Sequence, residues 1–324
     1  MTCDVAGRTG LLEILSWARP HDSSVEIAFC REFLDKIPGM MSDPFGNRML
    51  TIGDDPRIAW SCHVDTVARR GGYQEVTIDR DGIAHLAKGK AGMSLGADDG
   101  VGVWIMLNMI AAQRPGLYLF HRGEEQGCLG SSWLQKHNVA VLENIDAAIA
   151  FDRAGYSAVI THQSFGRTCS DAFAQSLAFA LNRLDHDFRY EPDDTGVFTD
   201  TNEYAGIVPE CTNLSVGYHN QHGPRETLDI AHCEKLLAAM LKLDASTLVI
   251  ERDPSIHEDD RWGSFGGPRS YRSYHDEYTD AVSEYPHLAA RILEELGFPL
   301  DDFRMAMWEE DMHGDGPYRP LMLS

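Results

Sequence analysis

The sequence predicts an α/β fold, a doubly wound and mostly parallel mixed sheet with helices on both faces. Up to about residue 250, short apolar runs typical of buried strands alternate with longer runs whose apolar residues recur at helical spacing. Hydrophobic residues make up 43% of the 324 residues, which is enough for a sizeable core. In such a sheet, ligands bind at the carboxyl ends of the strands. The polar residues that follow each strand are therefore the first candidates for a site.

The elements follow one another in chain order. The runs assigned to strands are short and apolar, and the helical runs carry an apolar stripe or are apolar throughout. We expect strands at 57–62, 117–120, 147–151 and 213–216. We expect helices at 11–17, 25–37, 100–112, 131–137, 171–182 and 232–243.

The composition changes near Arg252, which divides the chain into a main domain, residues 1–250, and an acidic C-terminal appendage, residues 251–324. The appendage is rich in Asp and Glu and lacks lysine, so we expect it to be partly helical or disordered. Its candidate helix covers 276–296 and breaks at Pro286. A solvated acidic tail is the simpler interpretation, and a docking surface for a partner is the alternative.

The charge of the chain limits its partners. The formal net charge is −22, which argues against binding to nucleic acid or to an anionic membrane. No apolar run approaches 18 residues, and residues 1–9 do not resemble a secretory signal. The seven cysteines are scattered and form no CxxC pair, which indicates a reducing compartment. We therefore expect a cytoplasmic protein.

A histidine and an aspartate directly follow the first predicted strand, 57–62. His63 and Asp65 are two residues apart, so in extended chain they face the same side. A histidine there can bind a metal ion, and the carboxylate can orient a ligand or the ring. On its own the pair is weak, because a polar strand end is more often ordinary.

Paired acids mark two further segments. Asp98 and Asp99 lie among small residues at the start of helix 100–112, where close backbone approach and cation coordination are compatible. Glu124 and Glu125 follow strand 117–120, and the pair suggests that one binds a metal ion while the other takes a proton from water. Acids are also common at helix starts and in solvated turns, so neither pair on its own predicts a metal site.

The last two segments again follow strands. Asp152 ends strand 147–151, and His219 and His222 follow strand 213–216; on chemistry alone either histidine can be a ligand. His, Asp, Glu-Glu, Asp and His thus succeed one another, most of them directly after a strand. A doubly wound sheet would gather these side chains at one edge. The set as a whole predicts a metal site.

These segments resemble the clan of co-catalytic zinc exopeptidases, which holds aminopeptidases, carboxypeptidases, aminoacyl-histidine dipeptidases and tripeptidases. The resemblance covers roughly residues 10–245, and its last part includes FTDTNEYAGIVPECTNLSVG (198–217). The strings that carry it are HVDTV (63–67), LGADDGVG (95–102), GEEQGCLGS (123–131), AFD (150–152) and HGPRE (222–226).

The resemblance implies a role for each residue of the site. It implies zinc-exopeptidase-like catalysis by residues 1–250, two zinc ions, with cobalt or manganese as alternatives, and a cis peptide bond between Asp98 and Asp99. The implied metal ligands are His63 and Asp152 for one ion, Glu125 and His222 for the other, and Asp98 between the two. Glu124 is the implied general base, and Asp65 the residue that holds His63. Tyr218, Asn202 and Arg225 are candidate substrate contacts.

The chain departs from the two-domain members of this clan in one respect. Those members insert a dimerising lid between the fourth and fifth ligands, and here only residues 153–221 lie between Asp152 and His222. These residues must also supply a helix and strands of the main sheet. We therefore expect no separate lid domain, an architecture closer to that of single-domain aminopeptidases.

The expected activity is hydrolysis of a terminal peptide bond of a small peptide, of aminopeptidase or dipeptidase type, with a metal-bridging water as the nucleophile. The first alternative is an N-acyl amino acid deacylase on the same scaffold. Others are a catalytically silent zinc-binding interaction protein and a single-zinc acyltransferase such as a glutaminyl cyclase. The sequence leaves open the side chain preferred, the substrate end that is cleaved, the native metal and whether the chain forms a homo-oligomer.

Overall fold

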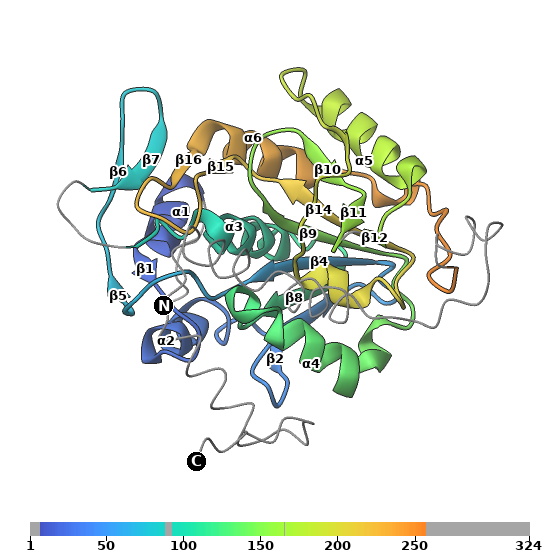
Figure 1. The fold of residues 1–324 in the computed structure, drawn as a ribbon, viewed down its shortest axis with the longest axis horizontal. Helices are drawn as coiled ribbons and strands as arrows, with labels where there is room; N and C mark the ends of the chain where they lie inside the picture. The colour runs from blue at the N-terminus through green and yellow to red at the C-terminus, as the bar shows by residue number, and fades with distance from the viewer. Residues whose placement is uncertain (1–6, 88–92, 165, 257–324) are drawn as a thin grey trace, which may run out of the picture. The chain divides into compact units, whose positions relative to one another are not determined.

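The computed structural model describes residues 7–87, 93–164 and 166–256. Its main sheet has eight strands (Figure 1). They are β2 (Met41–Ser42), β3 (Arg48–Ile52), β4 (Ile58–His63), β8 (Gly116–His121), β9 (Ala147–Arg153), β10 (Ala158–Ile160), β13 (Glu191–Asp193) and β14 (Glu210–Ser215).

The centre of this sheet is parallel and its flanks are mixed. The strand order is β13-β10-β14-β9-β4-β8-β3-β2. The pairs β14/β9, β9/β4, β4/β8 and β10/β13 are parallel, whereas β10/β14, β8/β3 and β3/β2 are antiparallel. The prediction of a mostly parallel mixed sheet is confirmed.

Helices cover both faces of the sheet. The α-helices are α1 (Gly7–Leu15), α2 (Ser24–Phe33), α3 (Ala97–Ala111), α4 (Leu129–His137), α5 (Asp171–Leu184) and α6 (Ile230–Met240). Short 3₁₀ helices are η1 (Glu124–Gln126), η2 (Val139–Leu142), η3 (Asp200–Tyr204) and η4 (Ala245–Thr247). Side chains cap several starts as the local sequence predicts: Ser23 accepts a hydrogen bond at α2, Ser170 at α5 and Asp229 at α6.

Alternation along the strands separates two hydrophobic cores. In β4, Trp60 belongs to the large core that includes α1, α3, α5 and α6, while its neighbour Ala59 belongs to a smaller core with α4 and η3. In β8, Phe120 and Leu119 divide in the same way. Figure 1 shows α3 and α6 on one side of the central strands and α4 on the other. Helices on both faces therefore follow directly from apolar residues on both sides of each strand.

A second, smaller sheet was not predicted from the sequence. It has the order β15-β16-β7-β6, and all its pairs are antiparallel. Its strands are β6 (Val76–Ile78), β7 (Ile83–Leu86), β15 (Tyr218–His219) and β16 (Thr227–Asp229). Residues 220–226 connect β15 to β16, so the segment with His222 lies on a hairpin of this sheet. Two short ladders complete the structure: β1 (Trp17–Ala18) with β5 (Gly72–Tyr73), and β11 (His162–Gln163) with β12 (Gly166–Arg167).

The described part of the chain contains no separate lid. Between Asp152 and His222 the described residues form strands of the main sheet, α5 and the short pieces around them. At the predicted domain boundary, Arg252 still binds this domain, because its guanidinium donates to the carbonyl oxygens of Ala205, Val208 and Pro209. The rest of the predicted appendage, residues 257–324 with the candidate helix at 276–296, lies outside the described residues.

Among the described residues, no helix is both long and apolar enough to cross a membrane. The six described cysteines are all buried and unpaired, and Cys3 lies outside the described range.

Candidate active site

The carboxyl ends of three adjacent parallel strands bring the first candidate residues together. β4 ends on His63, and β8 ends on its register partner His121. β9, on the other side of β4, carries Asp152 at its penultimate position. Parallel strands that end at one edge leave their following loops side by side. The site lies at this edge of the sheet.

Asp98 occupies the centre of the cluster. Its Oδ1 lies 3.0 Å from His63 Nε2, and its Oδ2 lies 3.0 Å from His222 Nε2. The peptide bond between Asp98 and Asp99 is cis. One carboxylate therefore faces two imidazoles that are 159 positions apart in the chain (222 − 63).

Two groups of potential metal ligands share Asp98. The first is His63, Asp98 and Asp152, with His63 Nε2 3.5 Å from Asp152 Oδ1. The second is Asp98, Glu125 and His222, with His222 Nε2 3.2 Å from Glu125 Oε2. Within each group the ligand atoms lie within 4.8 Å of one another. The structure thus brings together all five residues predicted as metal ligands, and their role in binding remains a prediction.

Asp65 fixes the turn that carries the two glutamates. Its carboxylate accepts hydrogen bonds from the backbone N–H groups of Gly123, Glu124 and Glu125, at 2.7, 3.2 and 3.2 Å. The His63 ring bonds the main-chain oxygen of Asp65 at 3.0 Å, whereas the Asp65 carboxylate is 3.7 Å from Nδ1. Asp65 therefore orients the histidine through its backbone and the glutamate turn through its side chain.

Two residues without a predicted role, Glu226 and Thr199, hold the ligands from behind. Glu226 accepts hydrogen bonds from the backbone N–H groups of Gly96 and Asp98, both at 3.0 Å. Thr199 donates a hydrogen bond of 2.7 Å to Asp152 Oδ2. Glu226 lies in the HGPRE string, so its position beside a ligand was a usable signal. Thr199 lies in the string 198–217, but nothing in the local sequence connects it to Asp152.

The cluster carries a surplus of buried negative charge. Burial, with the charge of Asp152 as a further cause, raises the pKa of Glu124 to about 10. Burial also raises the pKa values of Glu125 and Asp152. Hydrogen bonds to Asp98 and Glu125 raise the pKa of His222 to about 11. Among the described residues, Glu125 Oε1 has no hydrogen-bond partner although it is buried.

This environment suits bound cations. Carboxylates that repel one another in a buried site are stabilised by positive charge, and no described lysine or arginine forms an ion pair with Asp98, Glu125 or Asp152. Imidazole nitrogens with carboxylate oxygens are a ligand set that zinc and neighbouring transition metals accept. The donors present, including the orphaned oxygen of Glu125, therefore fit two divalent ions.

A comparison with protein families decides the identity of the chain at family level. The model of peptidase family M28 matches residues 48–243, more than half of the chain. The chain belongs to peptidase family M28. This membership confirms the predicted resemblance to zinc exopeptidases and the predicted class of enzyme, a metallopeptidase of exopeptidase type. No curated protein matches the sequence significantly.

Solved structures show the same fold. The aminopeptidase PepT of Bacillus cereus ATCC 10987 aligns with a TM-score of 0.55 at 14% identity, over 72% of this chain and 95% of its own. A tripeptidase of Staphylococcus aureus aligns with a TM-score of 0.59 at 14% identity, with the same coverage. PhTET1-12s, a form of the Pyrococcus horikoshii TET1 peptidase, aligns with a TM-score of 0.52 at 16% identity, over 72% of this chain and 98% of its own.

The three predicted substrate contacts of this M28 peptidase occupy different environments. Tyr218 is buried, and its hydroxyl donates to the main-chain oxygen of Asp152 at 3.0 Å and to its Oδ1 at 3.2 Å. Asn202 lies half-buried in η3, and Arg225 is exposed on the β15–β16 connection. In this structure Tyr218 thus supports Asp152, and its contact with substrate remains a prediction, as do those of the other two.

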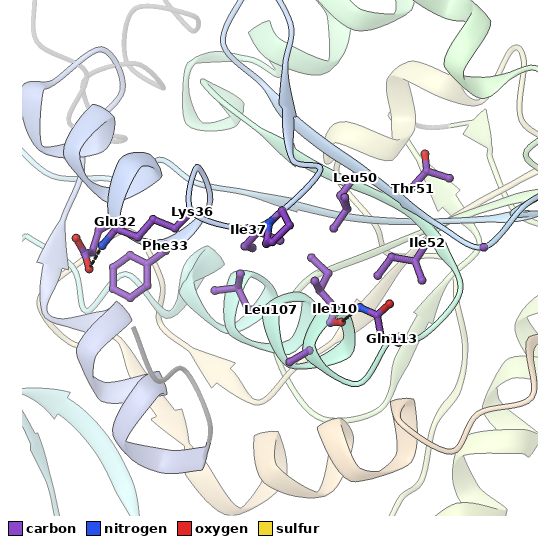
Figure 2. Close-up of a pocket in the computed structure, with 13 residues that line it drawn as sticks. Glu32, Phe33, Lys36, Ile37, Leu50, Thr51, Ile52, Leu107, Ile110 and Gln113 are labelled. Atoms are coloured by element: carbon purple, nitrogen blue, oxygen red, sulfur yellow. Dashed lines mark hydrogen bonds and ion pairs between the residues drawn. The ribbon is translucent and has the colours of Figure 1, made fainter. Parts of the chain in front are cut away.

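A cavity elsewhere in the M28 peptidase does not share this chemistry. It has a volume of about 600 Å³ and lies between the ends of α2 and α3 and strand β3 (Figure 2). Apolar side chains such as Phe33, Leu50 and Ile110 line it, and its charged residues, Glu32 and Lys36, form an ion pair with each other. None of its lining residues is a predicted ligand or base. The cluster around Asp98 is therefore the candidate for the reaction site.

Proposed function

We propose that this M28 peptidase is a two-metal aminopeptidase that releases residues from the amino end of small peptides. The observation that carries the proposal is the placement of Asp98 between His63 and His222, with Asp152 and Glu125 completing two ligand groups. His63, Asp98 and Asp152 would hold one ion, and Asp98, Glu125 and His222 the other. Two divalent cations bound there would polarise the scissile carbonyl group and lower the pKa of a water molecule toward neutrality.

Glu124 is the residue best placed to move a proton. Its Oε1 faces the thiol of Cys128 and its Oε2 faces His63 Nε2, both at 3.8 Å. No described nitrogen or hydroxyl group donates to it at hydrogen-bond distance, and two bound cations would lower the raised pKa of Glu124, so its carboxyl group would be able to exchange a proton. Asp65 holds its backbone N–H, which fixes the direction from which Glu124 approaches the substrate. We assign Glu124 as general base toward water and then general acid toward the leaving amine.

The charge around the site favours the amino end of a peptide over its carboxyl end. Asp200 is buried near Glu124, its Oδ2 has no hydrogen-bond partner among the described residues, and burial raises its pKa to about 8. A cationic α-amino group would stabilise the ionised form of this carboxyl group, whereas a terminal carboxylate would disfavour that form and would need a nearby cation. Arg225 is the candidate for that role, and its side chain is exposed.

The test compares two adjacent glutamates. Glu124→Gln should keep both metal ions and lose about 10²–10⁴-fold in turnover, because a general base contributes that much. Glu125→Gln is the matched variant and should lose metal from its group. Metal content and hydrolysis of aminoacyl anilides are measured on both. Near-normal turnover of Glu124→Gln with full metal content would overturn the assignment of the base.

The substrate class is tested by a panel. Free dipeptides, tripeptides, aminoacyl anilides and N-acetyl amino acids are offered to the metal-loaded enzyme. Turnover of anilides and tripeptides with a free amino group is expected. Turnover restricted to N-acetyl amino acids would establish the deacylase instead, and cleavage that requires a free carboxylate would reverse the proposed end.

Location and assembly are further proposals. The six buried, unpaired cysteines support a reducing, cytoplasmic location. A homo-oligomer is supported by PhTET1-12s, which shares the fold and is described as a dodecamer. Light scattering of the purified full chain tests assembly, and a monomer at micromolar concentration would contradict it.

A further inference from the structure

Arg19, which directly follows β1, is completely buried beside the site. Its guanidinium lies over the ring of Phe29, with Cζ 4.5 Å from the ring centroid. Its Nη1 donates to the carbonyl oxygens of Trp17 at 3.0 Å and Ile14 at 3.3 Å. Arginine is rarely buried to this extent, because removing its charge from water is costly. A buried arginine next to a metal centre therefore calls for an explanation.

The same side chain holds the segment that carries His63 and Asp65. Arg19 Nε donates to the main-chain oxygen of Val64, the residue between them, at 2.5 Å. The backbone of Arg19 adds two hydrogen bonds with Thr66: its N–H donates to Thr66 Oγ1 at 3.0 Å, and its carbonyl oxygen accepts from Thr66 N at 3.1 Å. Three hydrogen bonds thus clamp residues 64–66 just beyond the end of β4.

The segment that carries Asp98 leaves room for this arginine. A Cβ atom at Gly100 would lie 3.2 Å from Arg19 Nη2, and one at Gly96 would lie 3.7 Å from Nη1. The charges of Asp99 and Asp65 act on the guanidinium, and burial lowers the pKa of Arg19 only to about 10, so it stays protonated at neutral pH. Arg19 is therefore packed between the two loops that supply ligands to the proposed metal centre.

We propose that Arg19 is a positioning residue of the metal centre: its guanidinium and backbone clamp residues 64–66, so that His63 is presented to Asp98 and Asp65 to the glutamate turn. The inference rests on the proposed function, because it concerns the affinity of the site for cations. It adds a residue that precedes every one of the motif strings.

The direction in which metal affinity changes when Arg19 is replaced distinguishes a positioning residue from one that acts only through its charge or its packing. A positive charge near a metal centre repels cations, so its removal alone would strengthen metal binding. A residue that serves only packing would change the stability of the fold and leave the metal affinity of the folded protein unchanged. Loss of the clamp instead weakens metal binding, since residues that orient ligands typically contribute about 10–100-fold to affinity.

The experiment measures zinc binding to the metal-free full chain by competition with a chromogenic chelator, well below the unfolding temperature of each variant. Arg19→Met removes the guanidinium bond to the main-chain oxygen of Val64 together with the charge, and leaves the two backbone bonds with Thr66 in place. Arg19→Lys keeps the charge without the planar fork. Arg114→Met is the matched control. Arg114 lies just before β8, and its guanidinium also donates to a main-chain oxygen, that of Leu243. Thermal unfolding of the metal-free proteins is recorded in parallel.

We expect two zinc ions per wild-type chain, about tenfold or greater weakening in Arg19→Met, and a loss nearer to Arg19→Met than to wild type in Arg19→Lys. Arg114→Met should bind as wild type does, whatever its unfolding temperature. Unchanged or tighter binding by Arg19→Met would overturn the proposal, and wild-type binding by Arg19→Lys would reduce the role of Arg19 to charge. Absence of zinc from the wild type would overturn the proposed function instead.

A second variant covers the case in which Arg19→Met does not fold. Thr66→Val removes the hydroxyl that accepts from Arg19 N–H and keeps the shape of the side chain. A several-fold loss of zinc affinity supports the clamp, and unchanged affinity contradicts it.

Discussion

Glu226 Oε1 accepts a hydrogen bond of 3.0 Å from the backbone N–H of Asp98, although 128 positions separate the two residues. The bond ties the β15–β16 hairpin, which carries His222, to the loop that carries the shared carboxylate. Glu226 is almost fully buried, and burial raises its pKa to about 7. The relative placement of the two proposed metal positions therefore depends on a residue that touches neither.

Glu226→Gln should weaken metal binding by roughly 10–100-fold, because the amide can accept only one of the two backbone hydrogen bonds well. Isothermal titration of the metal-free chain with zinc measures the change. Glu210→Gln is the control, since Glu210 is equally buried and accepts from Ser170 N and Arg252 N away from the site. Equal weakening in both variants would show a general effect on stability.

Thr199→Val should weaken the ion held by His63, Asp98 and Asp152. The change removes the hydrogen bond of 2.7 Å to Asp152 Oδ2 and leaves the shape of the side chain nearly the same. We expect a loss of about 1 kcal/mol, or several-fold in affinity. Thr212→Val, which removes a buried hydroxyl that donates to Ile160 O, serves as control. Cobalt titration followed by absorption reports on each ion, and equal affinity in Thr199→Val and wild type would refute the role of Thr199.

Gly102→Ala should destabilise the protein although it lies within a helix. A Cβ atom there would meet both carboxylate oxygens of Asp99, one of them at 2.6 Å. In an unobstructed helix, Gly→Ala raises the free energy of unfolding by about 1 kcal/mol, whereas overpacking lowers it by about 1–3 kcal/mol. At Gly206 nothing lies within 4 Å of an added Cβ, so Gly206→Ala should be close to neutral. Urea denaturation measures both, and stabilisation by Gly102→Ala would contradict the packing described.

Acid should destabilise the metal-free chain partly through His232. Burial lowers the pKa of this histidine to about 4, so it stays neutral in the folded state while the unfolded chain takes up a proton below about pH 6.5. The contribution of His232 to the free energy of unfolding is complete above pH 6.5. It falls toward pH 4 by up to about 1.4 kcal/mol per pH unit. His232→Gln should flatten this part of the stability curve, measured by urea denaturation. His186 is exposed, and His186→Gln is the control that should leave the curve unchanged. If the curves of His232→Gln and wild type run parallel, His232 is not a cause of the acid destabilisation.

The sequence was informative where local pattern and chemistry coincide. The apolar runs around Trp60 and Ile149 predicted central strands of a parallel sheet, and the acids and histidines after them predicted its functional edge. The boundaries shifted by a few residues because helix and strand ends depend on caps and hydrogen bonds. Helix α2, for example, ends at Phe33 and not at Ile37.

Other parts depend on pairing between distant segments. Strands of two to four residues, such as β7 and β15, give no usable periodicity, and β7 meets β16 only in the folded chain. The choice between His219 and His222 was open on chemistry alone. In the structure His222 Nε2 faces Asp98, whereas the ring of His219 packs on Tyr156, with centroids 4.8 Å apart.

The most direct test of the account is a zinc titration of the metal-free enzyme with an aminoacyl anilide present. We expect two bound equivalents of zinc per chain, activity that requires metal, and loss of activity on chelation that added zinc reverses. Hydrolysis that persists in the metal-free enzyme, or a folded chain that binds no zinc, cobalt or manganese, would contradict it.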